Sequence, residues 1–183
     1  MAGRNACLGE APGGLRFSGR EGVMKFKSPI QVGGVSFSDD LQRCLAWSTA
    51  LAAPQPATSV TLLLAVLEAG RGTTAQRVLD DAGVTTHDLE PLELAARARQ
   101  PAPKGLKRLA SRVPGLTHSA DLERVLRRAV SLAVLDKRRV LTSDDMFLAL
   151  LTEDGPARDA LVSLGKEPSA MRSEVMRSRP LPE

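Results

Sequence analysis

The sequence predicts an all-α domain made of two pseudo-symmetric four-helix repeats, with a disordered N-terminal tail. Three observations lead to this fold class. The 183 residues include one Trp, four Phe and no Tyr, so the core must be built from Leu, Val and Ala, which favours helices over strands. Apolar residues recur at helical spacing. Two stretches of the chain also resemble each other at a nearly constant separation.

The internal repeat is the strongest of these observations. Residues 38–45 read SDDLQRCL and residues 119–126 read SADLERVL, an offset of 81. Further along, residues 62–67 (LLLAVL) correspond to residues 146–151 (MFLALL) at an offset of 84. The change in offset falls between predicted helices, where insertions are tolerated. The chain therefore contains two copies of one helical unit.

The first two helices of each repeat have recognisable starts. Ser38 and Ser119 are candidate N-caps of the first helix, because a serine side chain can accept a backbone N–H there. Aspartates follow both serines, and carboxylates suit the first turn of a helix. The second helix is expected to begin near the equivalent serines, Ser59 and Ser143.

The last two helices have recognisable ends. The third helix is expected over residues 74–82 in repeat 1 and from Pro156 in repeat 2, since proline suits the first helical position. Each copy is followed by a glycine suited to the C′ position, Gly83 and Gly165. The fourth helix is expected over residues 87–99 and 167–177.

Composition separates the repeats from the rest of the chain. The first 36 residues are rich in Gly, Ser and Arg without sustained periodicity, which indicates disorder. The segment between the repeats contains prolines and a run of cations without an acid, which indicates a basic linker. The predicted divisions are a tail over 1–36, a domain over 37–177 made of repeat 1 (37–99), the linker (100–117) and repeat 2 (118–177), and a tail over 178–183.

The charge and the cysteine content of the chain indicate its contacts and its cellular compartment. The formal net charge of +4 allows weak contacts with anions. No apolar run approaches the roughly 20 residues of a membrane span, and the N-terminus lacks the apolar stretch of a secretory signal. Cys7 and Cys44 lie in different contexts, so we expect no disulfide and a reducing, cytoplasmic compartment.

The two repeats resemble the Clp N-terminal domain family, whose double Clp repeat opens each copy with an aromatic–Thr pair. Phe37-Ser38 and His118-Ser119 match these openings. The family continues to a Thr-Glu-His-(Leu/Ile)-Leu-Leu helix, which is matched by Leu62–Leu67 in repeat 1 and by Ser143–Leu151 in repeat 2. The resemblance covers residues 37 to about 175.

The resemblance implies a recognition domain that stands at the front of ClpA- and ClpC-type AAA+ unfoldases and captures substrates and adaptors. The chain has no G-x-x-x-x-G-K-[ST] phosphate loop, so we expect a free-standing bacterial copy of the domain. We expect a non-enzymatic peptide- or protein-binding module, acting as adaptor, competitor or ligand sink. Its partners would be a Clp unfoldase, its substrates or its adaptors. We expect a monomer without a cofactor, a membrane partner or a nucleic-acid partner.

The resemblance also implies candidate ligand-binding residues. Some family members capture phosphorylated arginine with the Thr of the opening and the Glu of the second helix. The matching residues here are Ser119, Asp144 and Asp145 in repeat 2 and Ser38 in repeat 1. Val60 stands at the acidic position of repeat 1 and cannot accept a hydrogen bond through its side chain. We therefore expect at most one phosphoarginine-type site, in repeat 2.

Two other functions are weighed against this one. No catalytic or metal-binding residues are expected, because His87 and His118 lack metal-ligand spacing and His118 has no orienting acid. A surface or capping role is expected for His118, and Cys44 is expected to be a small buried residue. The alternative function is nucleic-acid association through the linker cations and residues 137–139. It is disfavoured because no aromatic residues are interleaved with these cations.

Overall fold

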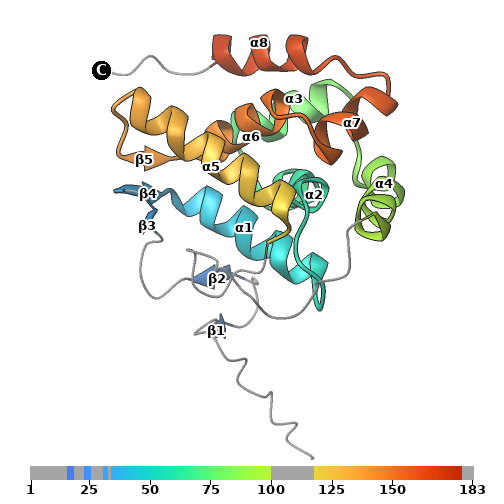
Figure 1. The fold of residues 1–183 in the computed structure, drawn as a ribbon, viewed down its shortest axis with the longest axis horizontal. Helices are drawn as coiled ribbons and strands as arrows, with labels where there is room; N and C mark the ends of the chain where they lie inside the picture. The colour runs from blue at the N-terminus through green and yellow to red at the C-terminus, as the bar shows by residue number, and fades with distance from the viewer. Residues whose placement is uncertain (1–15, 19–22, 26–30, 33, 100–117, 179–183) are drawn as a thin grey trace, which may run out of the picture.

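The structure is a computed structural model that describes residues 16–18, 23–25, 31–32, 34–99 and 118–178. The eight helices of this described part form two successive sets of four (Figure 1). The first set contains α1 (Asp39–Ala52), α2 (Ser59–Ala69), α3 (Thr74–Asp81) and α4 (Thr86–Ala98). The second contains α5 (Ala120–Leu135), α6 (Ser143–Thr152), α7 (Pro156–Ser163) and α8 (Pro168–Ser178). The predicted all-α, two-repeat fold is confirmed.

The second helix of each repeat begins with a threonine capping box. The Thr58 hydroxyl accepts the N–H of Thr61 at 3.0 Å, and the Thr61 hydroxyl accepts the N–H of Thr58 at 3.1 Å. Thr142 and Asp145 form the same reciprocal pair in repeat 2. These caps satisfy N–H groups that have no partner within the helix. The caps therefore lie one residue before the serines expected from the sequence, Ser59 and Ser143.

The third helix ends as expected in both repeats. Gly83 and Gly165 follow α3 and α7 with φ of 66° and 71°. This left-handed conformation favours glycine because it has no Cβ. Pro156 occupies the first helical position of α7, where its missing N–H costs nothing.

The core is centred on α2 and α6. Leu62, Leu63, Met146 and Phe147 in these helices are fully buried, because the two helices are apolar on nearly every side. α1 packs against α2, and α5 packs against α6. Each such buried side chain contributes about 1.5–3 kcal/mol to stability. No helix of the described part is long and apolar enough to cross a membrane.

Five short strands accompany the helices. β1 (Arg16–Ser18) pairs antiparallel with β2 (Val23–Lys25). In a second sheet, β3 (Gln31–Val32) pairs antiparallel with β4 (Val35–Phe37), and β4 pairs in parallel with β5 (Val140–Leu141). β4 precedes repeat 1 and β5 belongs to repeat 2, so this pairing joins the two halves of the molecule.

Strands β1 to β3 and most of β4 fall inside residues 1–36, the segment that the sequence predicts to be disordered. Val35 is buried, and the ordered domain therefore begins before residue 37. Strands of two or three residues show no sustained alternation, and the partner of β4 is about 100 residues away, so local patterns could not reveal it. The rest of 1–36, the linker over 100–117 and residues 179–183 lie outside the described residues.

Candidate functional site

The two repeats are joined where their helices begin. The N–H of Ser119, just before α5, donates to the carbonyl of Ala57, just before α2, at 2.9 Å. The N–H of Ser38, just before α1, donates to the carbonyl of Leu141, just before α6, also at 2.9 Å. Each first helix therefore starts against the segment that precedes the second helix of the other repeat.

Two aspartates add side-chain hydrogen bonds to this backbone junction between the repeats. Asp121 Oδ2, from α5, accepts the N–H of Ser59 at the start of α2 at 2.9 Å. Asp40 Oδ2, from α1, accepts the N–H of Ser143 at the start of α6 at 3.0 Å, and the Ser143 hydroxyl donates to the same oxygen. Helix N-termini carry unpaired N–H groups and a positive dipole end. Each repeat therefore supplies a carboxylate that caps the central helix of the other.

Both carboxyl groups are held in the ionised form. Burial raises the pKa of Asp40, but hydrogen bonds from the hydroxyl and N–H of Ser143 outweigh burial and hold this pKa below its ordinary value of 3.8. Burial likewise raises the pKa of Asp121, and hydrogen bonds involving Ser119 and Ser59 bring it below 3.8. The two caps are therefore fully charged at neutral pH.

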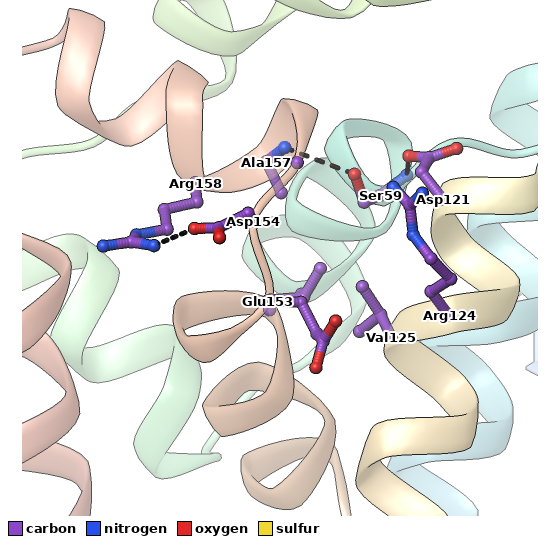
Figure 2. A pocket seen from close by; sticks show the side chains of 10 residues that line it. Ser59, Asp121, Arg124, Val125, Glu153, Asp154, Ala157 and Arg158 are labelled. Atoms are coloured by element: carbon purple, nitrogen blue, oxygen red, sulfur yellow. Dashed lines mark hydrogen bonds and ion pairs between the residues drawn. The ribbon is translucent and has the colours of Figure 1, made fainter.

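A small pocket opens beside the contact between Asp121 and Ser59 (Figure 2). Its cavity volume is about 10 Å³, which is roughly the space of one water molecule. As it stands, the pocket could therefore hold a water molecule or a small ion. The pocket lies between α2, α5, the end of α6 and the start of α7, and its lining residues are Ser59, Asp121, Arg124, Val125, Leu150, Glu153, Asp154, Gly155, Ala157 and Arg158.

The pocket holds charges of both signs. Arg158 pairs with Asp154 across its outer wall (Figure 2), and Glu153 lies 3.6 Å from the guanidinium of Arg128. Arg124 makes no hydrogen bond or ion pair with any residue that the structure describes. A Cβ at position 155 would lie 3.9 Å from the Arg124 guanidinium, an ordinary van der Waals contact, so residue 155 does not crowd this side chain. Within the described ranges, Arg124 is thus a cation without a partner, and it lines the pocket together with Asp121, Glu153 and Asp154.

The two serines among the predicted ligand-binding residues lie at the starts of α1 and α5. The Ser119 hydroxyl donates to the carboxylate of Asp121 and accepts the N–H of Leu122 at 3.4 Å, which makes it the N-cap of α5. The Ser38 hydroxyl is buried and forms no hydrogen bond of normal geometry with the described residues, although it contributes to lowering the pKa of Asp40. Neither serine lines the pocket.

The two predicted aspartates also have structural partners. Asp144 Oδ1 accepts the N–H of Ala75 at 2.8 Å and so caps α3 of the other repeat. Asp145 is only 3% exposed. Its carboxylate closes the capping box with Thr142 and pairs with Arg138. These aspartates begin α6, whereas the pocket lies near its end, so the structure does not bring them together with Arg124.

Two further expectations concern reactive side chains. Cys44 is fully buried in α1, and burial raises the pKa of its thiol to about 12. This confirms the expected small buried residue, because the reactive thiolate is not populated near neutral pH. Among the described residues, no three His, Cys, Asp or Glu side chains gather as potential metal ligands.

Comparison with known proteins identifies the repeats. A family model described as the Clp repeat (R) N-terminal domain matches residues 36–164. The chain belongs to this family. Clp N-terminal domains are substrate- and adaptor-binding modules of Clp AAA+ chaperones. A comparison with curated proteins finds no match to the chain.

Solved structures show the same Clp repeat fold. The N-terminal domain of the caseinolytic protease-associated chaperone ClpD from Arabidopsis thaliana superposes with a TM-score of 0.56 and 18% identity. That match covers 77% of this chain and 92% of the ClpD domain. The Hsp104 N-terminal domain from Candida albicans gives a TM-score of 0.56 and 19% identity, covering 78% of this chain and 91% of the Hsp104 domain.

The pocket of this Clp repeat domain was missed at the level of sequence. Asp40 and Asp121 correspond at the repeat offset of 81, but each was assigned to the first turn of its own helix. The available signal was that each already follows a serine N-cap, which leaves its carboxylate for another partner. Arg124 belongs to α5, whereas Glu153 and Asp154 lie between α6 and α7, and only the packing of α5 against α6 brings them together.

Proposed function

We propose that this Clp repeat domain is a non-enzymatic peptide- or protein-binding module tied to Clp-dependent proteolysis. It would act in the cytoplasm as a monomer and as an adaptor, competitor or ligand sink for a Clp unfoldase. Family membership over residues 36–164 supports a recognition role. The pocket between the repeats supports recognition of a small charged group.

The observation that carries this proposal is the unpaired Arg124 beside the pocket carboxylates. A planar guanidinium can hold a carboxylate or phosphate through two hydrogen bonds. Glu153 and Asp154 can in turn accept hydrogen bonds from a cation. The charges of a side chain such as phosphoarginine match this arrangement, with its phosphate on Arg124 and its guanidinium on the acids, and we propose that the small pocket widens to admit it.

Asp144 offers a second position for the same ligand. One of its oxygens caps Ala75, and its other oxygen, Oδ2, makes no hydrogen bond with the described residues. Val60 takes the equivalent place in repeat 1 and offers no acceptor. We therefore propose at most one phosphoarginine-type site, in repeat 2. The backbone segments that contain Asp145, Ser119 and Ser38 would hold this site in place.

A pull-down from native lysate tests the functional proposal. The immobilised domain should enrich a Clp unfoldase, its substrates or its adaptors, and Arg124→Gln should reduce that enrichment. Arg43→Gln is the matched control, because Arg43 lies at the repeat offset of 81 from Arg124. If no Clp component is enriched above the bare matrix, or if both variants behave alike, the proposal is wrong.

A further inference from the structure

His118 stands where repeat 1 has a buried aromatic residue. Phe37 lies at the repeat offset of 81, directly before the serine that begins α1, and is 3% exposed. Phe37 pairs in parallel with Leu141, and His118 forms the equivalent parallel bridge with Ala57. Repeat 2 therefore places an ionisable ring at a position that is apolar in repeat 1.

The described neighbours of His118 form no hydrogen bonds with its ring. Both of its nitrogens, Nδ1 and Nε2, are buried and have no hydrogen-bond partner within the part of the chain that the structure describes. Buried polar atoms without a partner are rare and costly in folded proteins. The ring of His118 therefore caps no helix among the described residues, and the residue as a whole is half-buried.

The charged groups near His118 give little support to its protonated form. Residues 53–61, which run past it into α2, contain no titratable side chain. On α5, the charge of Glu123 favours the imidazolium, whereas Asp121 is occupied by Ser119 and Ser59. Burial outweighs Glu123 and lowers the pKa of His118 below 6.5. The ring is neutral in the folded domain at neutral pH.

We propose that protonation of His118 opens the contact between the start of α5 and the segment before α2, so that acidification loosens the junction of the two repeats. An imidazolium here would bury a charge and two N–H donors without an acceptor. It would be drawn toward water and would pull on Ser119, whose N–H holds Ala57 at 2.9 Å. This inference does not depend on the proposed ligand.

The direction of the effect follows from proton linkage. Because the pKa is depressed by folding, the junction is fully stable above 6.5, the ordinary pKa of histidine. Its stability falls as the pH drops from 6.5 toward the pKa of the folded state and then levels off. Within that range, opening should increase by up to about tenfold per pH unit.

Nuclear magnetic resonance of the whole chain tests the proposal. The protein has only two histidines, so their ring signals can be separated with His87→Gln. We expect the His118 ring to titrate below pH 6.5. We also expect the protection of the Ser119 amide from hydrogen exchange, corrected for the intrinsic rate, to fall as the pH is lowered from 7 to 5.5.

Two variants complete the test. His118→Phe restores the residue type of repeat 1 and should keep Ser119 protection constant over that range. His87→Gln alters an exposed histidine and should leave the wild-type loss intact. Titration of His118 at or above pH 6.5, or unchanged protection of Ser119 in the wild type, overturns the proposal. The wild-type measurements decide the question even if His118→Phe fails to fold.

Discussion

Asp121 Oδ2 accepts the backbone N–H of Ser59 at 2.9 Å, although 62 residues separate them in sequence. The equivalent contact between Asp40 and Ser143 spans 103 residues. The two contacts correspond to each other under the internal repeat. The central helices α2 and α6 are thus each capped by the other repeat, so neither repeat satisfies its own backbone alone.

Removing one of these caps should destabilise the domain. Asp121→Ala leaves the N–H of Ser59 without a carboxylate and should lower the free energy of unfolding by about 1–2 kcal/mol. Chemical denaturation measures this loss. Asp39→Ala is the control, since Asp39 is an exposed first-turn acid and should cost less than about 0.5 kcal/mol. Equal losses in the two variants would show that Asp121 acts only through the dipole of its own helix.

The same caps should make the domain sensitive to strong acid. The pKa values of Asp40 and Asp121 are lowered by folding from 3.8, so their contribution is present above pH 3.8. It is lost as the pH falls from 3.8 through the pKa values of the folded state. Urea denaturation across this range should show a smaller loss in the double variant Asp40→Asn and Asp121→Asn. An unchanged pH profile would exclude these residues as its source.

The packing of α6 predicts a large effect at Leu148. This side chain is 7% exposed, so Leu148→Ala should cost about 2–5 kcal/mol through lost burial and the resulting cavity. Leu135→Ala is the control, because Leu135 is 76% exposed. Thermal or chemical denaturation measures both. A cost below about 1 kcal/mol at Leu148 would contradict the burial of α6.

Binding to DNA should be weak and non-specific. Lys104, Lys107 and Arg108 belong to the predicted linker, which lies outside the described residues. Several cations of the described part already have acidic partners, as in the pairs of Arg127 with Glu123 and of Arg138 with Asp136 and Asp145. We therefore expect no tight DNA binding at physiological salt in a filter-binding assay. Tight binding that is abolished by neutralising the three linker residues would favour the nucleic-acid alternative.

Much of the fold could be predicted because helices and repeats leave local signals. The glycines after α3 and α7 and the serines near the starts of the first two helices of each repeat marked these helices to within one or two residues. The capping threonines, Thr58 and Thr142, were missed because a serine at the next position is an equally good cap by residue type. β4 and β5 were missed because their pairing is decided by tertiary contact between the repeats.

The candidate site was harder to predict from the sequence than the fold. Asp144 and Asp145 were selected because of the family pattern, but the sequence could not show that one caps Ala75 and the other closes a box with Thr142. The position of Arg124 was equally hidden, since its lack of a partner among the described residues depends on how α5 packs beside α6 and α7. Residue type indicates the chemistry available, whereas the packing of helices decides which groups are already engaged.

Calorimetric titration of the whole chain with phosphoarginine tests the central claim most directly, with free arginine and inorganic phosphate as comparison ligands. We predict a stoichiometry near one, and weaker binding of both comparison ligands. Arg124→Gln should weaken binding if the ligand lies in the pocket, and Asp144→Asn should weaken it without unfolding if the ligand lies at the start of α6. No heat of binding, or a stoichiometry of two that neither variant changes, would contradict the account.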